Sequence, residues 1–348
     1  MSGIFSTLLA IFAVASIPIY ATVLVAILKN RRVEPFHSSF FKIFASLGVA
    51  DILMLAHSTV FHKMRAAGWL DDLYLAHRKG LVPKLTIIVS WYLGFSQTIG
   101  LTALSLNRCC AMCWPVKYNH WWTWKHLRVI LIAQWVVPAL CVLPLFATSM
   151  SVHRYKNRTE VVMDDKKYIN VYFLSLTITD VLIIAPTLLL LYLLSFYHMW
   201  RRTALTDGDN QSLRRKPSIN RRMGQTKLAI TAFVLFLTLL FLDSVLVLAT
   251  IWSLKHYKSG QENIYITSWW PVANDIFSAA NPWVLLALSR VTRKHFLKLF
   301  RKKPPPPPDV ASSSQKEDKL LMEPRAPLRP ESSDESQRAL VHKRVVIE

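Results

Sequence analysis

Four aspartates interrupt long apolar stretches of this chain, namely Asp51, Asp180, Asp243 and Asp275. A charged side chain at the centre of a bilayer costs about 2.5–3.5 kcal/mol on insertion scales, so each carboxylate needs a reason to be there. Either the carboxylate binds a ligand or an ion directly, or it holds neighbouring helices together through hydrogen bonds. We therefore treat all four as candidate functional residues.

Two of these carboxylates have possible partners close by in the sequence. Asp51 lies in the middle of the second apolar stretch, and the last stretch carries Asn274, Asp275, Asn281 and Pro282. The pattern predicts a buried polar network that joins these two stretches. Its simplest role is to hold the helices together, and direct binding of a ligand or ion is the alternative.

The other two carboxylates, Asp180 and Asp243, belong to the fifth and sixth apolar stretches. Asp180 lies on the outward side of Pro186. We take both aspartates as candidates for lining a ligand cavity. A hydrogen bond to a neighbouring helix is the alternative.

An arginine marks the end of the third apolar stretch. Asn107, Arg108 and Cys109 close this stretch, and Pro115 and Tyr118 follow in the next loop. Taken alone, such an arginine is best explained as a charge that extends to the membrane surface and orients the chain. Contact with a cytoplasmic partner is the other interpretation, and it depends on the residues around Arg108.

The sequence gives no support to catalysis or to a cofactor. The 11 histidines form no His-Glu-x-x-His pattern, and no glycine-rich phosphate loop occurs. Cys109, Cys110 and Cys113 lack the second pair that a zinc site needs, and with Cys141 they lie in or beside apolar stretches. We expect no enzyme activity, no metal, no cofactor and no disulfide framework.

The elements that must position these residues are transmembrane helices. Of the 348 residues, 52% are hydrophobic and 18% are charged, and about 20 consecutive apolar residues suffice for one crossing. This composition excludes a soluble enzyme. Seven apolar runs stand out, and together they predict an all-α bundle of seven spans: 4–28, 38–62, 84–108, 127–149, 168–198, 226–253 and 267–289. We expect the first run to be a retained helix, because no basic residue precedes it.

The positive charge of the chain lies mainly in loops. The net charge is +21, but the segments outside the spans cannot form a fold that binds nucleic-acid bases. Nucleic acid is therefore not an expected partner. Roughly twice as many Lys and Arg follow the odd-numbered spans as follow the even-numbered ones. This asymmetry predicts an outer N-terminus, a cytoplasmic C-terminus and contact of the basic loops with anionic lipid. Asn157, in an Asn-Arg-Thr glycosylation motif, falls on the predicted outer face.

The chain changes character after the last span. Residues 290–301 alternate basic and apolar side chains, which is typical of a short amphipathic helix in the inner interface. Five prolines follow at 304–308, and then a stretch rich in Ser, Glu and Pro. We predict a seven-span membrane domain over 1–301 and a disordered cytoplasmic tail over 302–348.

Several motifs resemble those of rhodopsin-like G-protein-coupled receptors. Asn107-Arg108-Cys109 resembles their Asp-Arg-Tyr motif, and Pro115 with Tyr118 resembles the loop that follows it. Further similarities lie in the second, fourth, fifth and last spans, at Asp51, Trp135, Pro138, Pro186, Asn281 and Pro282. The chain lacks the Gly-Asn of the first span, the Cys-Trp-x-Pro of the sixth and the cysteine pair that ties the third span to the second outer loop.

With these departures, the pattern over residues 10–300 is similar to that of nematode serpentine chemoreceptors, particularly those of the Srg and Srv type. The resemblance implies a receptor in the plasma membrane that binds a small environmental or endogenous ligand outside and activates a heterotrimeric G protein inside. It also implies that Asn107, Arg108, Pro115 and Tyr118 take part in coupling. A ligand-gated channel or a small-solute transporter is the alternative.

Overall fold

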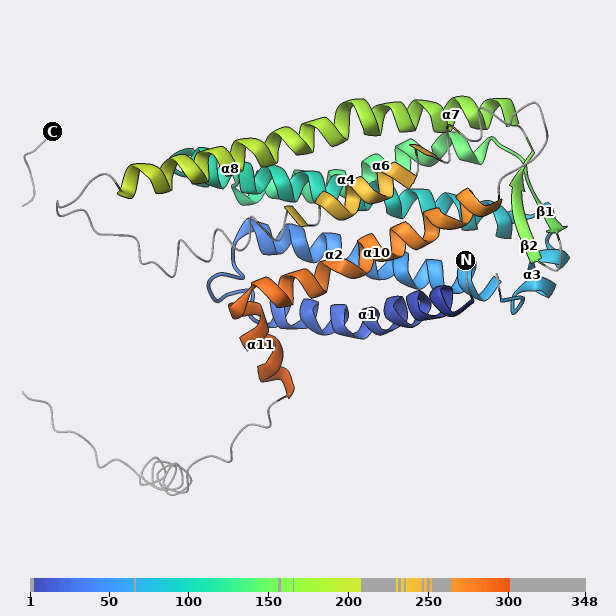
Figure 1. Cartoon of the computed structure of the whole chain (residues 1–348), viewed down its shortest axis with the longest axis horizontal. Coiled ribbons are helices and arrows are strands. Elements are labelled where there is room, and N and C mark those ends of the chain that lie inside the picture. The colour runs from blue at the N-terminus through green and yellow to red at the C-terminus, as the bar shows by residue number, and fades with distance from the viewer. Residues whose placement is uncertain are drawn as a thin grey trace, which may run out of the picture. The chain divides into compact units, whose positions relative to one another are not determined.

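The computed structural model describes residues 3–65, 67–155, 158–164, 166–207 and 264–300, together with parts of 230–251. These residues form a bundle of long helices that run alongside one another (Figure 1). The predicted glycosylation site at Asn157 and the predicted tail over 302–348 lie outside the described residues.

The long helices follow the apolar runs of the sequence. They are α1 (Gly3–Lys29), α2 (Ser39–His57) with its continuation η1 (Ser58–Met64), α4 (Leu81–Cys113), α6 (Trp124–Phe146), α7 (Lys166–Thr179) continued through η2 (Asp180–Ile184) into α8 (Ala185–Asp207), and α10 (Ile264–Leu288). Among the described residues, five helical stretches are long and apolar enough to cross a bilayer. Shorter apolar helices at Phe236–Val245 and Val272–Leu288 lie within the sixth and seventh predicted runs. The prediction of an all-α seven-span bundle is confirmed.

Two of the spans contain a turn of π-helix. The segment η2 ends two residues before Pro186, which has no N–H to donate to the carbonyl of Leu182. A wider turn accommodates this missing hydrogen bond. The other π-helical segment, η1, extends the second span to Met64, beyond the apolar run that the sequence shows.

The middle of the bundle is formed around α2 and α4. Helix α2 packs against α1, α4 and α10, while α4 also contacts α6 and α8. The core between them is rich in aromatic side chains, including Tyr20, Phe40 and Phe44. A Cβ atom at Gly48 would come within 2.8 Å of the Tyr20 ring. The absence of a side chain there lets the Tyr20 ring approach α2 closely.

One end of the bundle carries a β-hairpin that the sequence reading missed. Strands β1 (Met150–Tyr155) and β2 (Arg158–Met163) pair antiparallel. They lie next to the short helix α3 (Asp71–Ala76) (Figure 1). The Val152 amide donates to the Arg78 carbonyl at 2.8 Å, and the Arg65 guanidinium donates to the Thr159 carbonyl at 2.5 Å. The Thr159 hydroxyl also donates to the Asp71 carboxylate. We call this the hairpin end.

The opposite end carries α5 (Pro115–Trp121) and α11 (Arg290–Phe300). The predicted amphipathic helix after the last span is confirmed as α11. It has Thr292 buried and Leu297 and Phe300 exposed. The His295 ring meets the Phe36 ring edge-on, with 5.1 Å between the centroids. We call this the α11 end, which the charge distribution predicts to be cytoplasmic.

Candidate functional site

The centre of the bundle holds a fully buried carboxylate, Asp51 on α2. The Tyr20 hydroxyl of α1 donates to it at 2.6 Å, and the Gln97 amide of α4 donates to it at 2.7 Å. The Asn281 amide of α10 is the third donor. Four helices therefore meet at one carboxylate, and hydrogen bonds to its charged form offset its removal from water.

The network continues from Asp51 along α10. The Gln97 amide also donates to the Ser278 hydroxyl at 2.7 Å, and this hydroxyl donates to the Asn274 carbonyl at 2.8 Å. Pro282 is buried directly after Asn281. Tyr20, Gln97 and Ser278 were missed by the sequence reading. A single uncharged polar residue in an apolar run carries little insertion penalty, so the only available signal was its presence there.

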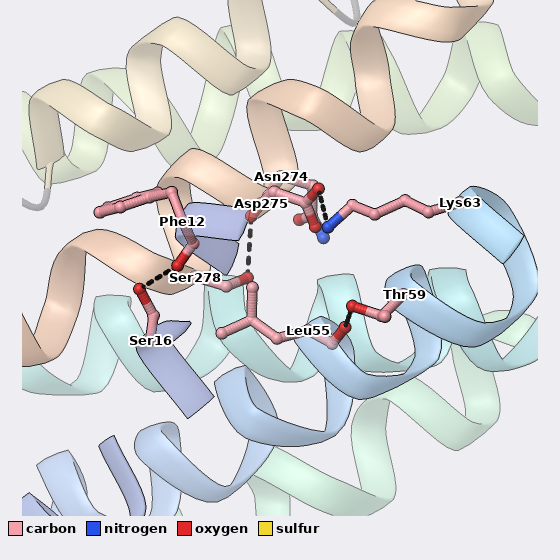
Figure 2. A network of polar contacts seen from close by, with 8 residues as sticks. All are labelled: Phe12, Ser16, Leu55, Thr59, Lys63, Asn274, Asp275 and Ser278. Carbon is pink, nitrogen blue, oxygen red and sulfur yellow. Dashed lines mark hydrogen bonds and ion pairs between the residues drawn. The ribbon is translucent and has the colours of Figure 1, made fainter. Parts of the chain in front are cut away.

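A second polar cluster lies toward the hairpin end of the same helices. The Lys63 ammonium of η1 forms an ion pair with the Asp275 carboxylate of α10, at 2.8 Å. Figure 2 shows Lys63 extending toward Asp275, with Asn274 beside it. The side chains of the predicted network thus fall into two clusters, with Asp51 and Asn281 in one and Asn274 and Asp275 in the other, and the Asn274 carbonyl links the two through Ser278. The apolar run ends at residue 62, so the sequence predicts that Lys63 lies in a loop, whereas the structure places it in η1.

At the α11 end, the residues expected to take part in coupling are close together. The Asn107 amide donates to the Tyr118 hydroxyl at 3.1 Å. The Arg108 guanidinium lies over the Phe40 ring, 3.5 Å from its centroid, which is a close cation–π contact. Pro115 is exposed at the first turn of α5, and its ring presets the backbone for a helix start.

Arg108 has no carboxylate partner in the described part of the chain, where the Lys63–Asp275 pair is the one ion pair found. Its Nε atom is buried there without a hydrogen-bond partner. Nearby, the hydroxyls of Ser105 and Tyr192 are 2.6 Å apart, and the Tyr192 ring packs on Phe236 with 5.1 Å between centroids. This region of the bundle therefore holds a partly buried cation among aromatic rings.

The two remaining aspartates lie together. Asp180, the first residue of η2, has its carboxyl in contact with that of Asp243. Asp243 is 6% exposed, and one oxygen of each carboxyl has no hydrogen-bond partner among the described residues. The structure thus pairs the two residues that the sequence nominated separately.

The last features of the site to consider are its possible metal ligands and its cysteines. A search of the described residues finds no group of three or more His, Cys, Asp or Glu side chains that could hold a metal ion. None of the four cysteines is in a disulfide, and the Cys109 and Cys113 sulfur atoms are 3.7 Å apart within one helix.

Comparison with known proteins gives a consistent result. Residues 9–302 match the family model described as serpentine type 7TM GPCR chemoreceptor Srv. The chain is 29% identical to serpentine receptor class V-1 of Caenorhabditis elegans, over 77% of this chain and 81% of that receptor. It is also similar to the thyrotropin-releasing hormone receptor of Mus musculus, at 24% identity over 73% of this chain and 68% of the receptor. The similarity to melatonin receptor type 1B-A of Danio rerio, at 27% identity, covers 35% of this chain and 40% of the receptor.

A match over most of the chain, together with the helical bundle and its Asp51–Asn281 contact, establishes the family. The chain is a multi-pass membrane protein that belongs to the Srv family of serpentine seven-transmembrane G-protein-coupled receptors.

Proposed function

We propose that this receptor is a chemoreceptor of the plasma membrane, which binds a small environmental or endogenous molecule on its outer side and activates a heterotrimeric G protein on its cytoplasmic side. Membership of the Srv family supports the receptor class. The ligand, the coupling and the orientation are the parts that the proposal adds.

The observation that carries the coupling proposal is the environment of Arg108. Its guanidinium is held against Phe40 and has no carboxylate partner in the described part of the chain. A guanidinium has five N–H donors in one plane, and without a carboxylate partner it is suited to bind carbonyl or carboxylate groups on an inserted partner helix. The Asn107–Tyr118 hydrogen bond joins the end of α4 to α5, so the arginine and the adjacent loop are positioned together.

A change at the outer side can reach Arg108 through the buried Asp51 network. Asp51, Gln97 and Asn281 connect α2, α4 and α10, and Arg108 lies on α4. A packed bundle with a shared polar centre favours discrete arrangements over continuous deformation. A ligand that binds one arrangement more tightly than another therefore shifts the population at both ends.

The test is nucleotide exchange on a G protein by membranes containing the wild type, Arg108→Ala or Arg108→Lys at matched surface levels. We expect Arg108→Ala to abolish exchange and Arg108→Lys to weaken it, since lysine keeps the charge but loses the planar fork. The matched control is Arg128→Ala, because Arg128 also lies over an aromatic ring, at 5.6 Å from Trp124, but is exposed on α6. Its exchange should equal that of the wild type.

Two results would contradict the proposal. Full exchange by Arg108→Ala would reduce this residue to a charge that orients the chain. A ligand-evoked current that survives block of all G proteins would favour the ligand-gated channel.

A further inference from the structure

The two residues of the Lys63–Asp275 ion pair differ in exposure and in flexibility. The Asp275 side chain is 3% exposed and is fixed on α10, whereas the Lys63 side chain is 22% exposed and reaches the carboxylate through a flexible stem (Figure 2). Lysine stems readily extend toward an aqueous boundary. The Lys63 Nζ atom itself is buried against the carboxylate, so the exposed part of this side chain is its stem. The carboxylate is fixed by its helix, whereas the ammonium can withdraw along the flexible stem.

The surroundings of the carboxylate are richer in acceptors than this one ammonium satisfies. Asp275 Oδ1 and Asn274 Oδ1 are buried and have no hydrogen bond of good geometry within the described residues, although the Ser58 hydroxyl lies beside the Asp275 carboxyl. Asn274 is 1% exposed and Asp275 is 2% exposed. Buried acceptors without donors are costly, and an acceptor-rich site favours a ligand that brings several N–H groups.

Charge limits what can replace Lys63. A buried carboxylate that loses its cation is left uncompensated, which is strongly destabilising. A neutral or anionic ligand that displaced Lys63 would leave Asp275 in that state. A ligand with a protonated amine would keep the charge balanced and would offer its other N–H groups to Asp275 Oδ1 and Asn274 Oδ1.

We propose that Asp275 and Asn274 form the binding site for the protonated amine of a small ligand, and that Lys63 is a built-in ammonium that occupies this site until the ligand displaces it. The inference gives a ligand class to the receptor function proposed above and rests on that function for its biological meaning. The site lies toward the hairpin end, where the chain from Lys63 continues to Arg65 and its contact with β2.

The position of the site also provides a route to the bundle centre. The Asn274 carbonyl accepts from Ser278, which accepts from Gln97, and Gln97 donates to Asp51. Exchange of the cation at Asp275 therefore acts on the α10 segment that carries Ser278 and Asn281. Release of Lys63 at the same time frees η1 from α10.

The test is chemical rescue with n-butylammonium as the probe and n-butanol as its neutral counterpart, measured as thermal stability of the purified full-length receptor. Lys63→Ala removes the tethered ammonium, so its melting temperature should fall and n-butylammonium should restore it in a saturable manner. Butanol should not. A tethered group competes at an effective concentration in the millimolar range, so half-saturation of the wild type should need about tenfold more n-butylammonium.

The controls are Asp275→Asn and the double variant Lys63→Ala/Asp275→Asn, in which no carboxylate remains to attract a cation. Neither should respond to n-butylammonium. If Lys63→Ala does not fold, the comparison of wild type with Asp275→Asn decides, since a saturable shift in the wild type alone supports the site. Equal shifts in all variants, or no shift in any, would overturn it.

This measurement needs no G protein, so it separates the two proposals. If n-butylammonium does not rescue Lys63→Ala but nucleotide exchange still depends on Arg108, the amine site is rejected and the coupling proposal stands. If n-butylammonium rescues Lys63→Ala but Arg108→Ala retains full exchange, the amine site is supported and the coupling proposal is rejected.

Discussion

Asp51 and Asn281 are joined by a direct side-chain hydrogen bond, although 230 residues separate them in the sequence. The bond ties α2 to α10, and the Tyr20 and Gln97 bonds to the same carboxylate add α1 and α4. Helices in a bilayer gain nothing from burying apolar surface against one another, so such polar contacts and close packing must set their relative positions. Asp51 is therefore a point at which the register of four helices is decided.

Replacement of Asp51 should lower the stability of the bundle. Asp51→Ala leaves three buried donors without their acceptor. Hydrogen bonds between membrane helices contribute about 0.6 kcal/mol each on average, so the loss should be about 2 kcal/mol. Thermal unfolding of the purified receptor measures it, with Asp72→Ala as control because Asp72 is an exposed aspartate of α3. Equal stability of the two variants would contradict a role for the carboxylate in joining the helices.

Asn107→Asp should lower the basal activity of the receptor. The change places a carboxylate beside Arg108 while an oxygen remains available to the Tyr118 hydroxyl. A new local ion pair should stabilise the inactive arrangement by about 1 kcal/mol, which lowers basal nucleotide exchange about fivefold. Asn119→Asp adds the same charge at an exposed position of α5, so it should leave basal exchange unchanged. If Asn107→Asp leaves basal exchange unchanged or raises it, the missing counter-ion does not govern the resting state.

Asp243→Asn should raise the stability of the protein. Asp180 and Asp243 hold their carboxyls in contact away from water, and two such groups repel each other when both are charged. An amide of the same shape removes the repulsion and can donate to the remaining carboxylate. Asp180→Asn should act in the same direction, and the double variant should gain less than the two single effects together. Melting temperatures that fall in both single variants would show that the pair is stabilising as it stands.

The docking of α11 should weaken in mild acid. Burial, with Lys298 and Lys294 adding to the effect, lowers the pKa of His295 below its ordinary value. The folded state therefore favours the neutral ring, and its contribution is present above about pH 6.5 and is lost as the pH falls. The protection factors of residues 290–300 in hydrogen exchange, which are corrected for the intrinsic effect of pH, should be smaller at pH 5.5 than at pH 7.5. His295→Phe should remove much of that difference, whereas His120→Phe, at an exposed position on α5, should not.

The orientation of the chain can be tested at Asn157. If the hairpin end is extracellular, Asn157→Gln should remove a glycan and increase electrophoretic mobility to that of the enzymatically deglycosylated wild type. A C-terminal tag should be accessible to antibody only after cells are permeabilised. A tag that is labelled on intact cells would reverse the assigned orientation.

The spans were predictable because bilayer thickness fixes the length of each apolar run. Charge within a run was equally visible, which is why Asp51, Asp180, Asp243 and Asp275 could be nominated from the sequence. Their partners were harder to find. Tyr20 and Gln97 are uncharged, and an isolated polar residue on a helix does not reveal whether it faces lipid or the bundle. Helix packing decides which polar side chain meets which carboxylate. The sequence of a single span does not contain this information.

Lys63 and the hairpin show a different kind of failure. The apolar run ends at residue 62, but η1 continues the helix to Met64, and the long stem of Lys63 carries its charge back to Asp275. The strands β1 and β2 are each six residues long. Such short segments give too little alternation to distinguish a strand from a polar loop.

The hairpin is anchored by hydrogen bonds from Val152, Arg65 and Thr159, and none of the four cysteines of the chain is in a disulfide. The folded receptor therefore has no covalent cross-link that a reductant could cut. High concentrations of dithiothreitol should leave its melting temperature unchanged, and its maturation should not depend on oxidising folding catalysts. Production in a reducing cell-free system supplied with lipid vesicles is accordingly a practical route to the protein.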